Sequence, residues 1–272
     1  MTEWSELVVD HEKREIALDL ARREPVVVTA SAKDSKGERL LLYARAFAHP
    51  RDARVRFEEA AHKYFLDGKP MPMSVSGFWG QFFSHFDSEG TISSCIGKWR
   101  KNTKGKYYPF LEALRAAGVP ESRDAEIIKT LWELNGDGQS SLGTGLHRAI
   151  ELDINEELFE EPPEEPDLIE ASASEAPLVP HLRGVFNLVP KAVPWALGFI
   201  LGTESGEKPD LSVAPSRRSK EFEYYLKWKA DHPELLPVRQ EMNVFSEEYL
   251  LVGQLDALYY DTVAKMFKIV DW

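Results

Sequence analysis

Two aspartates lie in neighbouring strand-like runs of this sequence and are the residues best placed to do chemistry. Asp256 belongs to Val252-Gly253-Gln254-Leu255-Asp256, and Asp271 to Lys268-Ile269-Val270-Asp271-Trp272. A carboxylate in an apolar strand must face solvent, pair with a cation or bind a metal ion. Bound Mg²⁺ or Mn²⁺ prefers such oxygen ligands and can generate hydroxide near neutral pH. The pair therefore predicts a metal centre that hydrolyses phosphodiester bonds.

A histidine and two glutamates are candidates for the same centre. His147 and Glu151 follow Gly143-Thr144-Gly145-Leu146 and lie about one helical turn apart, while Glu241 lies in the preceding strand-like run. An imidazole ligand shifts the metal preference toward Mn²⁺. The predicted metal ligands are His147, Asp256, Asp271 and the backbone carbonyl of Trp272, and the predicted catalytic carboxylates are Asp256, Asp271, Glu241 and Glu151. Both glutamates could instead form surface salt bridges with Arg148, Lys229 or Arg239.

Strand register decides whether these carboxylates meet. The three runs, separated by short turns, predict an antiparallel meander over Val238–Phe245, Tyr249–Tyr260 and Lys265–Trp272. If Tyr260 pairs with Lys265, Asp256 and Asp271 are diagonal neighbours on one face, about 7–8 Å apart. An even loop also turns Glu241 toward that face, whereas an odd loop would separate the aspartates.

The order of these motifs resembles the PD-(D/E)xK nuclease superfamily, in its RecB-like and phage-exonuclease-like branch. The similar elements are Gly143-Thr144-x-x-His147-x-x-x-Glu151, Glu241, Gly253-x-x-Asp256 and Asp271-Trp272. The segment His62–Ser76 also resembles the lead-in of viral and phage-type members. The resemblance implies a core helix that begins at the histidine, Mg²⁺ or Mn²⁺ as cofactor, and a lysine one residue after Trp272.

The resemblance further implies an α+β fold with the first half of a restriction-endonuclease-like core, namely one helix and the three-stranded meander. The expected function is metal-dependent hydrolysis of nucleic-acid phosphodiesters, chiefly DNA, by a domain that is incomplete without residues beyond Trp272. One alternative is a catalytically inactive nucleic-acid-binding or scaffold module of the same fold. A second alternative is an RNase-H-like polynucleotidyl transferase, which also uses clustered carboxylates.

Five cations near the middle of the sequence are the predicted nucleic-acid contacts. They alternate with aromatic residues that could stack on bases, and they are Lys98, Arg100, Lys101, Lys104 and Lys106. The alternative is an ordinary solvated helix end and loop. A second aromatic group, Phe78, Trp79, Phe82, Phe83 and Phe86, is predicted to be core.

The composition, with 43% hydrophobic and 29% charged residues, is typical of a soluble globular protein. No apolar run reaches the roughly 18 residues of a membrane span, and the acidic N-terminal sequence argues against a targeting peptide. Cys95 is the single cysteine, which predicts an intracellular, reducing compartment, either nucleus or cytoplasm. The net charge of −12 does not exclude nucleic acid, because most of the acidic excess lies between Arg148 and Arg183.

Four consecutive segments are predicted. They are an N-terminal helix and hairpin over 1–53, a mostly helical region over 54–154 that ends in the His147 helix, a flexible acidic Pro-rich insertion over 155–218, and a partial nuclease sheet over 219–272.

Overall fold

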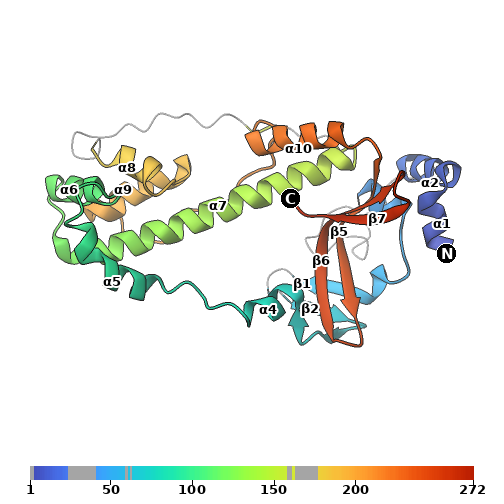
Figure 1. The fold of residues 1–272 in the computed structure, drawn as a ribbon, viewed down its shortest axis with the longest axis horizontal. Helices are drawn as coiled ribbons and strands as arrows, with labels where there is room; N and C mark the ends of the chain where they lie inside the picture. Colours follow the sequence, from blue (N-terminus) through green and yellow to red (C-terminus); the bar gives the residue numbers. More distant parts are fainter. Residues whose placement is uncertain (1–2, 24–40, 59–60, 62, 158–160, 163–176) are drawn as a thin grey trace. The chain divides into compact units, whose positions relative to one another are not determined.

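The computed structural model describes residues 3–23, 41–58, 61, 63–157, 161–162 and 177–272, and it is an α+β structure (Figure 1). The chain divides into two compact units. Unit 1 contains Met1–Ser84, His147–Glu160 and Arg217–Trp272, and unit 2 contains His85–Leu146 and Glu161–Ser216. Each unit is built from separated stretches, whereas sequence reasoning divided the chain into consecutive segments.

Unit 1 contains a mixed sheet of β4 (Met73–Ser74), β5 (Leu235–Ser246), β6 (Leu251–Asp261) and β7 (Met266–Val270). Strands β5, β6 and β7 form the predicted antiparallel meander, and β4 pairs parallel with the start of β6. A second antiparallel sheet has the order β1-β2-β3, over Val55–Glu58, Lys63–Leu66 and Lys69–Pro70. Its β2–β3 turn, Asp67-Gly68, has positive φ at both residues, as a tight hairpin turn requires.

The N-terminal part of unit 1 is helical. The predicted helix over Glu3–Arg23 is present as α1 (Glu3–Val9) and α2 (His11–Arg23). The predicted hairpin is wrong, because residues Leu42–Ala46 form helix α3; its other proposed strand, Pro25–Thr29, lies outside the described residues. A short apolar run fits a strand or a helix equally well, and here burial of Leu42 and Tyr43 selects the helix. A 3₁₀ turn, η1 (Asp52–Arg54), leads into β1.

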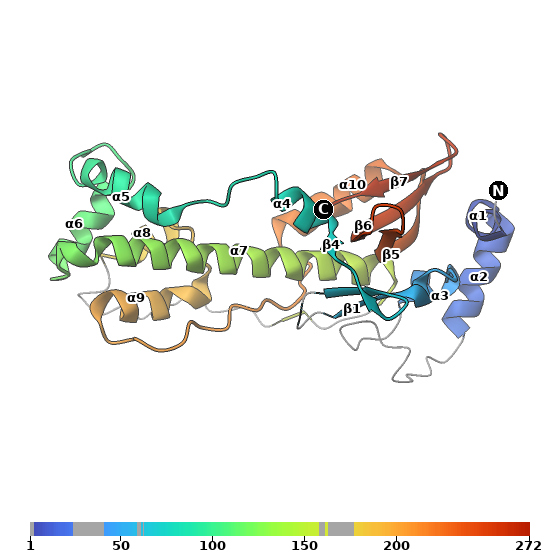
Figure 2. The ribbon, with the colours of Figure 1, turned by 90° about the horizontal axis from the view of Figure 1, so that it is seen from below.

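Two further helices of unit 1 begin at serine caps. Ser74 accepts a hydrogen bond from the backbone N–H of Gly77 at the start of α4 (Val75–Gly80), and Ser219 caps α10 (Lys220–Asp231) in the same way. In Figures 1 and 2, α10 runs beside the C-terminal end of α7. The aromatic group that begins on α4 was predicted to be core, but all five of its rings are exposed. Two of them, Phe78 and Trp79, lie on α4 itself, where none of the six residues is buried.

Unit 2 is a helical cluster. Its elements are α5 (Ser88–Trp99), α6 (Tyr108–Ala116), η2 (Glu121–Arg123), the first part of α7 (Asp124–Ile154), α8 (Val179–Gly184), η3 (Pro190–Ala192) and α9 (Val193–Leu201). They share one apolar core, which includes Phe110, Leu114, Ile127, Leu131, Leu182, Phe186, Leu197 and Ile200.

The predicted flexible insertion contains three helical elements within its described residues, namely α8, η3 and α9. Pro180, Pro190 and Pro194 lie in the first turns of α8, η3 and α9. Proline suits these positions because the first backbone N–H groups of a helix have no partner within it. A proline pattern that suggested disorder thus marks helix starts, while residues 158–160 and 163–176 lie outside the described chain.

Helix α7 is continuous for 31 residues. Gly136 and Gly138 both lie inside α7, although glycine often marks the end of a helix. A side chain at position 138 would contact Val189, since an added Cβ would lie 3.1 Å from a methyl carbon of that valine. This glycine therefore permits close packing, and His147 lies in the interior of α7, contrary to the predicted helix start. None of the described helices has the length and apolarity of a membrane span.

Candidate metal centre

Three side chains from three elements of unit 1 converge. One ligand atom from each of His147 on α7, Glu241 on β5 and Asp256 on β6 lies within 4.8 Å of the others, and all three residues are partly buried. Two carboxylates and one imidazole form a donor set that suits Mn²⁺ or Mg²⁺. Sequence reasoning named all three residues, and the structure brings them together.

Contacts at both ring nitrogens orient His147. Its Nε2 lies 3.2 Å from the backbone carbonyl oxygen of Trp272, and its Nδ1 lies 3.4 Å from Asp256 Oδ2. A carbonyl only accepts hydrogen bonds, so in its Nε2–H tautomer the His147 ring donates to Trp272 and presents the Nδ1 lone pair to the centre. Histidine ligands of metals usually donate in this way to a carbonyl or carboxylate. The Trp272 carbonyl, which was predicted as a metal ligand, lies beside Nε2 of His147 in the structure.

Asp256 is fixed by the C-terminal residue and not by a cation. Its Oδ2 accepts a hydrogen bond of 3.0 Å from the backbone N–H of Trp272. The Trp272 ring packs edge-on against Tyr225 and Trp228 of α10, with centroid distances of 5.3 and 4.9 Å. Among the described residues, no lysine or arginine nitrogen lies within 4 Å of Asp256, so its charge is available to an added cation.

The strand register differs from the predicted register by two residues. Tyr260 pairs with Phe267 instead of Lys265, and pairing begins at Asp261 with Met266. Asp261 sets this turn by accepting hydrogen bonds from the backbone N–H groups of Val263 and Ala264 at 2.9 and 2.7 Å. A shift of two residues preserves the face of every side chain.

Continued past β7, this register places Asp271 directly opposite Asp256, where a diagonal position was predicted. The Asp256 carboxylate, through a hydrogen bond and its negative charge, raises the pKa of Asp271. A proton shared between the two aspartates is the response expected of like charges in contact. Asp271 is exposed and is not part of the three-residue group.

Glu241 has an unusual backbone conformation. Its φ is +47°, a region in which residues other than glycine are uncommon. Successive side chains of a strand normally point to opposite faces, yet Gln240 bonds Asn155 just after α7, and Glu241 approaches His147 on α7. The positive φ of Glu241 breaks this alternation, so the side chains of Gln240 and Glu241 both point toward the C-terminal part of α7 and the residue that follows it.

Gln254 supports this conformation of Glu241. Its Nε2 donates to the backbone oxygen of Glu241 at 3.1 Å. Sequence reasoning did not name Gln254, although its position two residues before Asp256 places it on the same strand face.

Glu151 is not part of the group. It forms a salt bridge with Arg148, one of the alternatives open from sequence, and only 12% of its side chain is exposed. Its position four residues after His147 predicted proximity along the helix, but not the direction of the side chain.

The predicted nucleic-acid contacts divide into two kinds. Lys98, Lys101, Lys104 and Lys106 are exposed at the end of α5 and in the turn before α6. Arg100 is instead internal to unit 2, with its guanidinium 2.8 Å from the carboxylate of Asp124.

The aromatic residues between these lysines are also structural. Trp99 and Tyr107 stack at a centroid distance of 4.5 Å, and Trp132 Nε1 donates to the Tyr107 hydroxyl at 3.0 Å. These rings hold the turn, so base stacking by them, predicted from sequence, does not fit their packing. The four lysines remain as candidate phosphate contacts.

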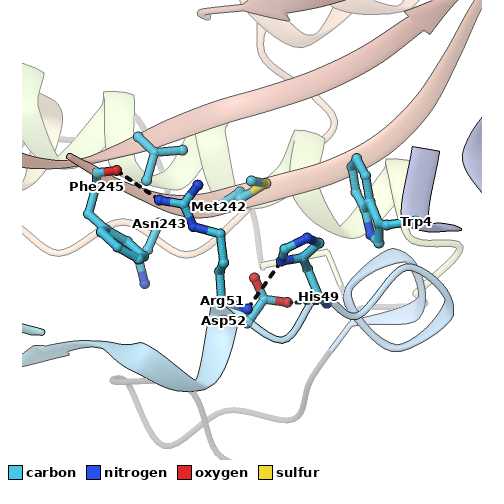
Figure 3. A pocket seen from close by; sticks show the side chains of 8 residues that line it. Trp4, His49, Arg51, Asp52, Met242, Asn243 and Phe245 are labelled. Atoms are coloured by element: carbon cyan, nitrogen blue, oxygen red, sulfur yellow. Dashed lines mark hydrogen bonds between the residues drawn. The ribbon is translucent and has the colours of Figure 1, made fainter. Parts of the chain in front are cut away.

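A cavity of about 180 Å³ lies beside β5, between Trp4 and His49 on one side and Phe245 on the other (Figure 3). Its charged groups already have partners. Arg51 lies over the Phe245 ring and donates to the Phe245 carbonyl, and Asp52 pairs with Arg239 at 2.7 Å. The cavity therefore shows the packing of η1 against β5 and offers no reactive group.

Comparison of the chain with models of known protein families, with curated proteins and with solved structures finds no significant match.

Proposed function

We propose that the chain carries the metal centre of a nuclease that hydrolyses nucleic-acid phosphodiester bonds, with DNA as the principal substrate. The observation that carries the proposal is the convergence of His147, Glu241 and Asp256 within 4.8 Å. His147 Nδ1 and one oxygen of each carboxylate would hold Mn²⁺ or Mg²⁺, with Asp271 beside them. The metal would supply Lewis-acid stabilisation of the phosphoryl oxygens and a hydroxide nucleophile.

The fold supports this proposal at the level of arrangement. A helix that carries the histidine packs with an antiparallel meander that carries Glu241 and Asp256, which is the order of elements in the first half of a restriction-endonuclease-like core. An imidazole among the donors favours this class over the RNase-H-like alternative, whose centre consists of carboxylates. In the family that the chain resembles, a lysine positions the attacking water, but no lysine lies within 4 Å of Asp256 among the described residues. Metal binding and DNA cleavage must therefore be measured separately.

The decisive experiment compares the unmodified chain with Asp256→Ala. Calorimetric titration with Mn²⁺ should show one site that the substitution abolishes, and labelled single- and double-stranded DNA should be cleaved with Mn²⁺ but not with EDTA. Asp231→Ala is the matched control, since Asp231 is an exposed aspartate of unit 1 at the end of α10. Equal Mn²⁺ binding by both variants would refute the centre. Mn²⁺ and DNA binding without cleavage would favour the alternative of an inactive binding module.

We propose that the four exposed lysines of unit 2 contact the phosphate backbone. None of them lies within 4 Å of a carboxylate among the described residues, and the stacked Trp99 and Tyr107 fix the turn that presents them. Lysine contacts of this kind are independent of base sequence and sensitive to salt.

A further inference from the structure

Four aromatic side chains form a continuous exposed patch on unit 1, called here the α4 patch. It consists of Phe78, Trp79, Phe82 and Phe83, which are 36%, 57%, 65% and 68% exposed. The rings contact one another, with centroid distances of 5.2 Å between Phe78 and Phe82 and 6.5 Å between Trp79 and Phe83. Exposed apolar groups of this size mark binding surfaces, because leaving them in water is unfavourable.

The α4 patch lies near β6, the strand that carries Asp256. Ser74 of β4 pairs with Val252 of β6, and α4 begins at the next residue. A side chain at position 253 would collide with Val75, since an added Cβ would lie 3.0 Å from a methyl carbon of that valine. Gly253 therefore lets α4 lie against β6 only three residues before Asp256.

The chemistry of the patch fits nucleobases. Between Ser74 and Ser84 the sequence has no charged residue, and Val75 is its single aliphatic side chain. The surface thus offers aromatic faces with no carboxylate in the segment to repel a phosphate backbone. Aromatic platforms of this kind bind single-stranded nucleic acid because every base presents a π face.

We infer that the α4 patch stacks on unpaired bases of the nucleic acid whose phosphodiester lies at the metal centre. The inference rests on the proposed function and narrows its substrate to single strands or frayed ends, since bases inside a duplex are already stacked on one another. The continuity of α4 with β6 places base binding and hydrolysis on neighbouring parts of unit 1.

The test measures binding by the full chain in EDTA, so that no cleavage occurs. Fluorescence anisotropy would compare a labelled single-stranded DNA oligonucleotide with a blunt duplex of the same length. Phe82→Ala/Phe83→Ala should weaken single-strand binding at least tenfold and leave duplex binding unchanged. Tyr224→Ala/Tyr249→Ala is the matched control, because these rings are 68% and 69% exposed elsewhere on unit 1, and it should bind as the unmodified chain does.

A second readout reports contact directly. Stacking of a base on Trp79 should quench its fluorescence, and Trp79→Leu should remove that part of the quenching. Unchanged single-strand binding by the double variant, an equal loss of duplex binding, or a patch-dependent dimer in sedimentation would each overturn the inference. Mn²⁺-dependent cleavage that persists alongside such a result would leave the nuclease proposal intact. If the unmodified chain neither binds Mn²⁺ nor cleaves DNA but still stacks on single strands, only the nuclease proposal is refuted.

Discussion

The two units surround a buried or partly buried aspartate with groups of opposite charge. In unit 2, Asp124 is 1% exposed and is held by two guanidinium groups, those of Arg100 and Arg115. In unit 1, Asp256 is partly buried and has His147, Asp271 and a backbone N–H as its neighbours. The first aspartate is neutralised by the fold, whereas the second is brought next to other acids.

This difference distinguishes a carboxylate whose charge is compensated within the fold from one that we propose binds a metal ion. Burying a carboxylate costs free energy unless a cation compensates it. Where a fold places carboxylates together without such compensation, a bound cation would reduce the repulsion between them. The lysines of unit 2 differ from one another in the same respect. Lys129 and Lys208 pair with carboxylates, whereas the four exposed lysines have no carboxylate partner among the described residues.

Removing the compensated aspartate should have the largest effect on stability. Asp124→Ala leaves two arginines without their shared partner and should lower the free energy of unfolding by about 3 kcal/mol. Asp256→Ala relieves repulsion and should change it by less than about 1 kcal/mol. Urea unfolding at neutral pH measures both. A larger loss for Asp256→Ala than for Asp124→Ala would contradict the division into structural and functional carboxylates.

Sequence alone predicted the residues of the centre better than the elements that carry them. Asp256 could be found because it is a carboxylate inside an apolar run, whereas His147 was found from the order of the motifs and Glu241 from the parity of a hairpin loop. The exact partner of Tyr260 could not be found, because it depends on hydrogen bonds made by the Asp261 side chain within the turn.

The fold was less predictable where one local pattern has two physical meanings. Prolines mark both disordered segments and first turns of helices, and glycines such as Gly138 both end helices and allow close packing. In each case a partner distant in sequence decides, as Val189 does for Gly138. The aromatic group of α4 was placed in the core because hydrophobicity alone does not distinguish a core from a binding surface.

The uncompensated lysines should dominate the salt dependence of DNA binding. Substituting Lys98, Lys101, Lys104 and Lys106 together by alanine should reduce the slope of log affinity against log salt concentration by about 3–4, because each phosphate contact contributes about 0.9. Lys129→Ala/Lys208→Ala, which removes lysines already paired with carboxylates, should leave the slope unchanged. Filter binding between low and moderate salt measures it, and equal slopes for both variants would remove unit 2 from the interface.

Gln254→Ala tests the hydrogen bond that supports the backbone of Glu241 in the proposed metal centre. The substitution removes the hydrogen bond to the Glu241 backbone oxygen and should lower Mn²⁺ affinity about tenfold, the usual effect of losing a residue that orients a ligand. Gln254→Glu keeps the size of the side chain but loses the amide donor, so it should not restore the affinity that the hydrogen bond provides. Titration calorimetry of both variants decides this, and unaltered Mn²⁺ affinity in Gln254→Ala would show that Glu241 keeps its conformation without help.

Strand β6 itself contains both kinds of aspartate. Asp261, five residues after Asp256, is paired with a cation. It is buried but paired with Lys268 at 2.6 Å, and this hydrogen bond, with those from the turn, lowers its pKa. A folded-state pKa below the unfolded value stabilises the fold above that value, and the contribution is lost as the pH falls through the folded pKa. Asp261→Asn should therefore melt below the unmodified chain at neutral pH, by a difference that disappears in acid. Thermal unfolding from pH 7 to pH 2 measures this difference. A difference that persists at the lowest pH would mean that Asp261 acts through turn geometry and not through charge, and that pairing with a lysine is not what distinguishes it from Asp256.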